Sequence, residues 1–533
     1  MKKLILTSKA NFAEIRQLGG LYVDKTKEIY DCIGKDSYYF LSRPRRFGKS
    51  LLCSTLKEMF SGNRELFKGL WLDSSDWSWE KHPVIHLSMI DMAGEQNDAA
   101  GIEEKLRIRL NNIAQNYGVQ LSTSSYIDLV FTVLVEALYK KTGSKVVIIV
   151  DEYDKPMLDL IGKTEVQAEV HSVLRSFYGT FKALESSVRF VFLTGVYKFS
   201  KTSVFSSLNN LNDLTFLPKA GTLLGYTQEE VELYFSEEID ALAISLGIDR
   251  TQTLERLQDK YNGYHFGVNV DTRQLSPGVY NPFGLNHTFA ETQMFEKWFE
   301  SGSPSFLIKK IAEGNFKDVG PEGLDVDFGA LNNSCDPDAI TATSLLYYAG
   351  YATMQEFDSH TRYVRLGYPN SEIAEATSKE LFALFVGSSE LSPTHKIALK
   401  IADCLQSHQL DNLKDLFNQA LAQLTYKIIL NHEKYFQTVI LLMLNMTRLR
   451  AHAEIPTNDG SMDIVVETRS EIFIIELKFN KPAAEGLRQI KDKNYAKKFK
   501  IQGLPITAIG LSITLQKEAD MHKCVADVAI EKL

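Results

Sequence analysis

Two carboxylates and a lysine lie near the C-terminus, inside two adjacent apolar segments. Asp463 belongs to the first segment, and Glu476 and Lys478 belong to the second. We expect both segments to be strands that pair as a hairpin across residues 468–470, which would bring the carboxylates together. Side chains alternate along a strand, so Glu476 and Lys478 share one face.

This spacing suits the hydrolysis of a phosphodiester. That reaction needs a metal ion to activate water and neutralise the developing charge, and a cation to position the nucleophile. Asp463, Glu476 and the Leu477 carbonyl could hold Mg²⁺, with Lys478 beside it. Acids and lysines at strand edges also form ordinary surface ion pairs. We favour the catalytic metal site, because charge is unwelcome in a run as apolar as the one around Ile475.

A basic stripe follows this candidate site. Such a stripe is usually a solvated helix face, but beside a metal site it would follow a phosphate backbone. Its eight members are Lys478, Lys481, Arg488, Lys491, Lys493, Lys497, Lys498 and Lys500.

A second set of chemically capable residues lies far upstream, where Gly48, Lys49 and Ser50 follow an apolar segment and precede a helical one. In a unit of strand, loop and helix, backbone N–H groups cradle phosphates, the lysine reaches the outer phosphates and the serine holds magnesium. The usual first glycine of such a loop is here Arg43. The residues expected to bind a nucleotide in this loop are Arg45, Arg46, Phe47, Gly48, Lys49, Ser50 and Leu51.

Acidic residues complete the candidate nucleotide site. Asp151 and Glu152 follow the apolar run 146–150, so one carboxylate could bind magnesium and the other could polarise the attacking water. Thr194 ends a further apolar segment, either as a sensor of the γ-phosphate or as an ordinary strand-end threonine. Arg175 is either an arginine finger delivered to a neighbouring subunit or a surface residue.

The bulk properties indicate a globular protein with two to four domains. The chain has 533 residues, 44% of them hydrophobic and 24% charged. No window is apolar enough for a membrane helix or a signal peptide, so we expect a cytoplasmic protein without a membrane partner. Five scattered cysteines indicate neither a zinc site nor a disulfide framework. The net charge of -8 argues against nonspecific nucleic-acid affinity over the whole surface.

The pattern of apolar segments predicts an α/β protein. Strands at 38–41, 84–90, 146–150 and 188–194 alternate with amphipathic stretches, as in a parallel sheet flanked by helices. Helical periodicity dominates after Tyr226, where a capping box begins at Thr227, and the turn-rich segment 261–267 interrupts it. The C-terminal part reads as a helix, two strands, a helix over 485–500 and a strand over 506–513. The expected domains are 1–225, 226–390 and 391–533.

Four motifs together resemble the bacterial AAA-ATPase-like family that carries a C-terminal nuclease-like domain of the PD-(D/E)XK type. They are Tyr22-Val23-Asp24-Lys25-Thr26, Arg43-Pro44-Arg45-Arg46-Phe47-Gly48-Lys49-Ser50, Asp151-Glu152-Tyr153-Asp154 and Thr194-Gly195-Val196-Tyr197-Lys198-Phe199-Ser200.

The resemblance implies an N-terminal P-loop NTPase that takes ATP, a helical middle region and a C-terminal restriction-endonuclease-like domain. An arginine-rich phosphate loop is typical of that family, which implies that Arg43, Arg45 or Arg46 contacts phosphate. The family often has proline where this chain has Met462.

The resemblance also implies two accessory catalytic residues beside the C-terminal strands. Glu433 matches an acid that completes the metal shell, and Gln489, followed by Tyr495, matches a polar helix. Both residues could instead be ordinary helix-surface groups.

We therefore expect an ATP-binding and ATP-hydrolysing protein coupled to a Mg²⁺-dependent nuclease, with DNA as the expected substrate and homo-oligomerisation open. One alternative is a nucleotide-dependent switch or assembly protein whose nuclease-like domain only binds nucleic acid or a partner. Another is a nuclease whose phosphate loop is structural.

Overall fold

The computed structural model divides into two compact units, residues 1–302 with 326–365, and residues 303–325 with 366–533. The three-part division expected from the sequence stays a prediction. The structure describes residues 3–34, 37–92, 98–121, 126–160, 164–198, 211–294, 324–332, 341–386, 392–424, 432–447, 449–457, 460–518 and 521–533.

A parallel sheet forms the centre of the first unit, as predicted. Its strand order is β2-β3-β4-β1-β5, and every neighbouring pair is parallel. Every residue of β3 is buried, which agrees with the uninterrupted apolar run of a central strand. The strands are β1 (Tyr38–Ser42), β2 (Val84–Ser88), β3 (Val146–Asp151), β4 (Val188–Gly195) and β5 (Asn212–Asp213).

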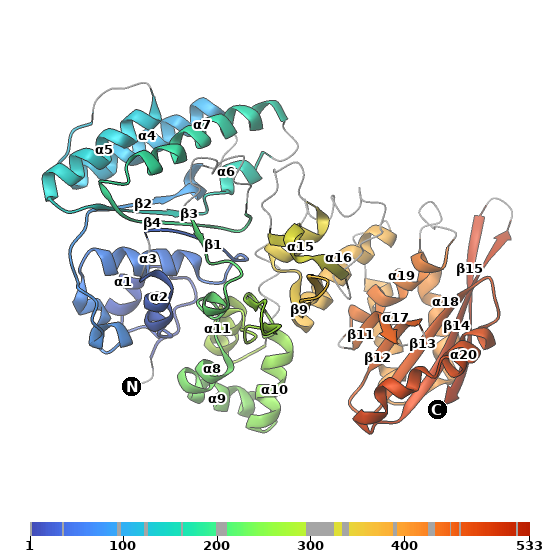
Figure 1. Ribbon diagram of the computed structural model, residues 1–533. Coiled ribbons are helices and arrows are strands. Elements are labelled where there is room, and N and C mark those ends of the chain that lie inside the picture. The colour runs from blue at the N-terminus through green and yellow to red at the C-terminus, as the bar shows by residue number, and fades with distance from the viewer. Residues whose placement is uncertain are drawn as a thin grey trace. The chain divides into compact units, whose positions relative to one another are not determined.

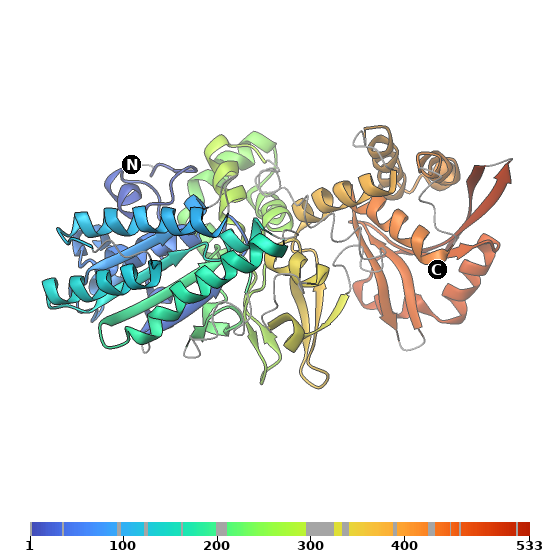
Figure 2. The same ribbon diagram turned by 90° about the horizontal axis from the view of Figure 1, so that it is seen from above.

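Helices cover both faces of this sheet. Figure 1 shows α1, α2 and α3 below the strands and α4, α5 and α7 above them, and Figure 2 shows the upper helices running along the strands. Parallel strands need such crossover helices, because each connection must return to the starting edge of the sheet. The helices are α1 (Phe12–Gln17), α2 (Thr26–Ile33), α3 (Lys49–Phe60), α4 (Ala99–Asn116), α5 (Ile127–Thr142), α6 (Lys155–Leu158) and α7 (Thr164–Ala183).

A mainly helical region follows, as expected from Tyr226 onward. The predicted capping box is confirmed, because Thr227 and Glu230 each bond the backbone N–H of the other. The predicted break at 261–267 separates α10 from the β6-β7 pair. The elements are α8 (Gln228–Tyr234), α9 (Ser236–Leu246), α10 (Arg250–Tyr261), β6 (Val268–Asn269), β7 (Gln274–Leu275), α11 (Pro282–Glu291), β8 (Leu324–Asp327), α14 (Phe328–Asn332), α15 (Ala342–Ala349), β9 (Thr353–Asp358) and β10 (Tyr363–Gly367), with β8, β9 and β10 in one small sheet.

The second unit holds a mixed five-stranded sheet in the order β11-β12-β13-β14-β15. The predicted hairpin of β12 and β13 is confirmed, and β13 pairs in parallel with β14. The elements are α16 (Ser371–Val386), α17 (Ser392–Gln406), α18 (Leu413–Leu421), α19 (Glu433–Asn445), β11 (Arg450–Thr457), β12 (Gly460–Glu467), β13 (Ile472–Phe479), α20 (Ala483–Asp492), the 3-10 helix η8 (Tyr495–Gln502), β14 (Ile506–Glu518) and β15 (Met521–Lys532).

One predicted helix of the second unit is wrong as a continuous element. The expected helix over 485–500 ends at Asp492, and the chain turns at Asn494 with φ 46° before η8 begins. Asparagine adopts this left-handed conformation more readily than most residues. Of the helices in the described ranges, none has both the length and the apolar composition needed to cross a bilayer.

Candidate active sites

The phosphate loop of the first unit connects β1 to α3. Gly48 has φ 96°, a conformation that favours glycine, and α3 begins at the next residue. Lys49 is buried, and its ammonium donates to the carbonyl oxygens of Arg43 at 3.0 Å and Pro44 at 2.9 Å. The predicted strand, loop and helix are therefore present, with the lysine folded onto its own loop and Ser50 half-buried beside it.

Arg43 does not face the loop's interior, contrary to the expectation that it could contact phosphate. Its side chain is buried, and its guanidinium donates to the carbonyl oxygens of Ser42, Thr215 and Ala220, each at 2.8 Å. The same group lies 4.4 Å from the ring centre of Phe266. Burial lowers the pKa of Arg43 to about 10. Arg43 thus joins the end of β1 to the segment that follows β5.

The next residues of the loop pack against the helical region. The Phe47 ring is buried between Tyr264 and Phe266, at centroid distances of 4.7 and 5.2 Å. Arg46, at φ 67°, lies 4.6 Å from the ring centre of Phe283. Arg45 is exposed, and its charge acts on Lys49 and Glu152. Arg45 is therefore the arginine of this loop that is exposed to solvent and whose charge also acts on residues of the candidate nucleotide site.

Lys49, Asp151 and Glu152 lie together at the C-terminal ends of the parallel strands. Asp151 ends β3 and is almost fully buried, and its Oδ1 has no hydrogen-bond partner. Glu152 has φ 52°, a strained conformation for a glutamate. Burial raises the pKa of Glu152, and the charge of Lys49 opposes that rise. Burial lowers the pKa of Lys49, whereas Asp151 and Glu152 raise it. These three groups therefore form one electrostatic cluster.

Thr194 lies beside Asp151 in the register of β3 and β4. It is fully buried, and its hydroxyl donates to the Leu41 carbonyl at 2.7 Å. The structure thus places it as a strand-end threonine with a backbone partner, and a sensor role stays a prediction. Arg175 lies on the exposed side of α7. Phe199 and Ser200 of the fourth sequence motif fall outside the described residues.

Asp154 is a further residue of this site that sequence reasoning left without a role. Its Oδ2 accepts hydrogen bonds from the backbone N–H groups of Val196 at 2.9 Å and Tyr197 at 2.7 Å. Burial raises its pKa to about 6. The carboxylate therefore holds the end of β4 against the chain that follows β3. A second aspartate three residues after Asp151 was the signal that could have revealed it.

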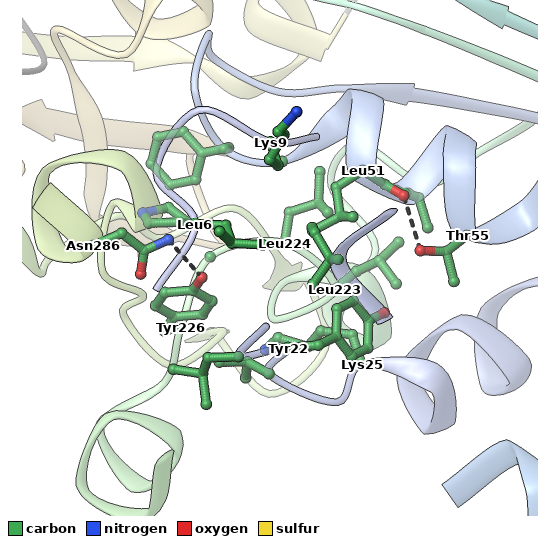
Figure 3. Close-up of a pocket in the computed structure, with 18 of the residues that line it drawn as sticks. Leu6, Lys9, Tyr22, Lys25, Leu51, Thr55, Leu223, Leu224, Tyr226 and Asn286 are labelled. Carbon is green, nitrogen blue, oxygen red and sulfur yellow. Dashed lines mark hydrogen bonds between the residues drawn. The ribbon is translucent and has the colours of Figure 1, made fainter. Parts of the chain in front are cut away.

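A pocket of about 730 Å³, part of it open to solvent, lies next to the phosphate loop (Figure 3). Phe47, Gly48 and Leu51 form the wall on the loop side. The other walls come from the N-terminal segment and the helical region and include Leu6, Tyr22, Lys25, Leu224, Tyr226 and Asn286. The lining is mostly apolar, as is usual in small-molecule pockets.

Asp463 and Glu476 lie side by side in the second unit. Their neighbours Ile464 and Ile475 are paired in the antiparallel register of β12 and β13. Asp463 Oδ2 accepts the backbone N–H of Leu477 at 2.8 Å. The hairpin thus brings together the two carboxylates that the sequence separates by a turn.

Lys478 shares a face of β13 with Glu476, as the alternation of side chains requires. Its Nζ lies 3.1 Å from Glu476 Oε1 and 2.8 Å from the Leu477 carbonyl oxygen. Both side chains are buried, and Glu476 Oε2 has no hydrogen-bond partner. An exposed surface ion pair would not bury these groups, so the structure argues against that alternative.

Burial and mutual repulsion disfavour the charged forms of the two acids. Burial raises the pKa of Glu476, and the charge of Asp463 adds to the rise. Burial also raises the pKa of Asp463, and Glu433 and Glu454 add to it. Lys478 opposes both shifts. Perturbed carboxylates of this kind are common where a protein holds a metal or moves a proton.

The accessory residues differ in how near they come to this pair. Glu433, at the start of α19, accepts the backbone N–H of Phe479 at 2.9 Å and acts electrostatically on Asp463. Gln489 instead bonds the Tyr495 hydroxyl, which donates to the Ser461 carbonyl oxygen at 2.7 Å. The structure therefore brings Glu433 to the site, whereas Gln489 is linked to β12 through Tyr495.

Sequence reasoning missed a polar connection between α19 and the strands. Gln437 donates to Glu454 Oε1 at 3.1 Å and to the Asp463 carbonyl oxygen at 2.9 Å. Glu454 has φ 52°, and its neighbours Ala453 and Ile455 pair with Ile464 and Met462 of β12. The sequence signal that could have indicated this connection is the acidic residue Glu454 between the apolar residues Ala453 and Ile455.

The donor set of the second unit fits a cation only in part. The unpartnered Glu476 Oε2 and the neighbouring Asp463 are hard oxygen donors of the kind that Mg²⁺ prefers. Among the described residues, no group of three or more His, Cys, Asp or Glu side chains forms a ready-made metal cage. Any metal bound here would use two carboxylates together with carbonyl or water oxygens. The predicted basic stripe is largely exposed on α20 and η8, and Lys491 pairs there with Glu531.

Comparison with known proteins supports a description in two domains. Residues 8–205 match a family described as a predicted AAA-ATPase, and residues 431–523 match the PD-(D/E)XK nuclease superfamily. A protein of Azotobacter chroococcum mcd 1, named as an uncharacterized protein in the vnfD 5'region, is 33% identical over 516 residues. That alignment covers 94% of this chain and 95% of the Azotobacter protein.

Proposed function

Because the chain belongs to a family that joins a predicted AAA-ATPase to a PD-(D/E)XK nuclease-like domain, we propose that it binds and hydrolyses ATP and cleaves nucleic acid with Mg²⁺. One observation carries the proposal. Each unit holds a buried carboxylate oxygen without a hydrogen-bond partner, Asp151 Oδ1 in the first and Glu476 Oε2 in the second. A buried unpaired acceptor is costly, and a bound cation would satisfy it.

In the first unit, the loop before α3 binds the triphosphate through its backbone N–H groups. Lys49 leaves the Arg43 and Pro44 carbonyl oxygens and turns to the outer phosphates. Ser50 and Asp151 hold the magnesium that accompanies the nucleotide. Glu152, whose pKa burial raises, orients the attacking water and accepts its proton.

In the second unit, Asp463 and Glu476 hold the metal, with Glu433 supporting the shell. Bound Mg²⁺ supplies a Lewis acid that activates water and neutralises charge on the phosphate. Lys478 positions the nucleophile and stabilises the phosphorane-like transition state. The exposed lysines of α20 and η8 follow the substrate's phosphate backbone, with DNA as the favoured substrate.

ATP controls cleavage in this proposal. Nucleotide binding in the first unit changes the conformation of the phosphate loop, whose Phe47 packs against Tyr264 and Phe266. This conformational change is passed along the chain to the second unit. Hydrolysis then resets the first unit. The alternative is a nucleotide-dependent switch whose nuclease-like unit binds nucleic acid without cleaving it.

The test is a cleavage assay on single- and double-stranded DNA and RNA, with and without Mg²⁺ and ATP. We expect metal-dependent cleavage that Asp463→Ala abolishes and that Lys49→Ala uncouples from ATP. Lys497→Ala, on the exposed basic stripe, is the matched control and should weaken binding without removing cleavage. No cleavage with any metal would overturn the nuclease assignment and favour the switch. An identical cleavage rate with and without ATP would remove the coupling.

A further inference from the structure

The pocket beside the phosphate loop lies where a nucleotide's base would reach. Gly48 and Leu51 belong to its wall and to the start of α3, so a triphosphate on the loop would place the rest of the nucleotide at this wall. The side chains of Leu6, Leu51 and Leu224 are apolar, and Figure 3 shows them around the cavity with Tyr22 and Tyr226. An apolar lining that includes two aromatic rings suits a purine ring.

Two polar side chains share one side of this apolar pocket. Asn286 Nδ2 donates to the Tyr226 hydroxyl at 3.2 Å, as the dashed line in Figure 3 shows. Asn286 Oδ1 is buried and has no hydrogen-bond partner. The Tyr226 oxygen accepts from Asn286, so its own O–H remains a donor. The pair therefore offers one acceptor and one donor next to each other.

The backbone holds this pair in place. Asn286 lies in the first turns of α11, whose N-cap residue Asn281 accepts from two backbone N–H groups. Tyr226 exchanges backbone hydrogen bonds with Tyr280. Gly225, at φ 84°, turns the chain between Leu224 and Tyr226, and a Cβ there would lie 2.7 Å from Val279. The polar pair is thus positioned before any ligand arrives.

We propose that Asn286 selects adenine, its Oδ1 accepting a hydrogen bond from the 6-amino group while Tyr226 donates to the neighbouring ring nitrogen. The assignment rests on the proposed binding of ATP and adds to it the residue that reads the base. Burial raises the pKa of Tyr226 to about 12, so the hydroxyl keeps its proton at neutral pH. A site with a buried acceptor rejects an analogue that lacks the matching donor.

The test measures binding rather than turnover. Unlabelled ATP and purine riboside triphosphate, which lacks only the 6-amino group, compete with a ribose-labelled fluorescent ATP in the presence of Mg²⁺. The full chain should bind ATP about tenfold more tightly than the analogue, the value of one net hydrogen bond. In Asn286→Leu this ratio should fall to about one, because the acceptor is gone. Asn286→Asp keeps an acceptor and should keep the preference.

The neighbouring residue on α11 supplies the control. His287 does not line the pocket, so His287→Ala should keep the preference of the unchanged chain. Thermal unfolding without nucleotide shows whether Asn286→Leu is folded, and the ratio measured in the unchanged chain tests the assignment if it is not. Tight ATP binding with a ratio near one in the unchanged chain would overturn this assignment alone. No ATP binding at all would overturn the proposed function as well.

Discussion

Lys478 Nζ donates a hydrogen bond to Glu476 Oε1 over 3.1 Å, from two residues further along the same buried strand. The same ammonium also bonds the Leu477 carbonyl oxygen at 2.8 Å. A metal ion bound by the free Glu476 Oε2 and that carbonyl would share the Leu477 carbonyl oxygen with the lysine and would lie beside its positive charge. The lysine and the metal are therefore competitors for part of the site.

This competition predicts opposite effects for the two residues on metal affinity. In Lys478→Met, Mn²⁺ should bind at least as tightly as in the unchanged chain, because a competing cation is gone, while cleavage falls about 100-fold. In Glu476→Gln, Mn²⁺ affinity should fall about tenfold or more and cleavage should disappear. Electron paramagnetic resonance of free Mn²⁺ measures the affinity. Equal loss of Mn²⁺ binding in both variants would contradict the proposed division of roles.

Metal affinity should rise with pH in the second unit. Burial raises the pKa of Asp463 and of Glu476, to about 6 and about 7, so these acids hold protons near neutral pH that a metal must displace. Between pH 6 and pH 8, Mg²⁺ affinity should therefore increase, by up to about tenfold per pH unit for each proton released. Calorimetry in two buffers with different ionisation enthalpies measures that release. The prediction would be contradicted by an Mg²⁺ affinity that does not change between pH 6 and pH 8. It would also be contradicted if Asp463→Asn released as many protons on metal binding as the unchanged chain.

Arg43 should matter for stability more than for phosphate binding. Arg43→Met leaves the carbonyl oxygens of Ser42, Thr215 and Ala220 without their buried donor. The free energy of unfolding of the first unit should therefore fall by about 2–5 kcal/mol. Arg45→Met, at an exposed position, should change that free energy by less than about 0.5 kcal/mol.

Tryptophan fluorescence isolates this measurement. Trp71, Trp77 and Trp79 lie in the described part of the first unit, so their emission follows its unfolding. Urea unfolding of both arginine variants gives the comparison. The structural role of Arg43 would be refuted by two variants of equal stability, or by a loss of ATP binding without a loss of stability.

Asp154 should make the stability of the first unit depend on pH. Its pKa is about 6 in the folded protein against 3.8 in a model compound, so the folded state binds the proton more tightly. The corresponding stabilisation is present below about pH 4 and is lost as pH rises through about 6, with an upper limit of about 3 kcal/mol. Asp154→Asn cannot titrate there. Relative to the unchanged chain, this variant should therefore gain stability between pH 5 and pH 7.5.

Urea unfolding followed by tryptophan emission at those two pH values tests the sign. Val196 and Tyr197 both donate to Asp154 Oδ2 in the folded state, so one asparagine oxygen in that place can accept both bonds. A constant stability difference between Asp154→Asn and the unchanged chain from pH 5 to pH 7.5 would show that the carboxylate does not titrate in this range.

Local chemistry made much of the fold predictable. The uninterrupted apolar run 146–150 predicted a strand buried on both faces, because only a sheet covered twice can bury every residue of a strand. The capping box at Thr227 was equally local, since its two hydrogen bonds join residues three positions apart. The helix over 485–500 was predicted as continuous, because residues on both sides of Asn494 have helical composition. The left-handed turn at Asn494 divides it.

The sequence by itself determined which residues carry chemistry and on which elements they lie, because alternation along a strand and the order of strand, loop and helix are local rules. It therefore predicted that Glu476 and Lys478 share one face and that Lys49 begins a helix. Only the tertiary structure decided where each charge points, because burial and hydrogen bonding depend on segments far apart in the chain. Arg43 turned inward to Thr215 and Ala220, and Asn286 reached the pocket beside Gly48 from more than two hundred residues away.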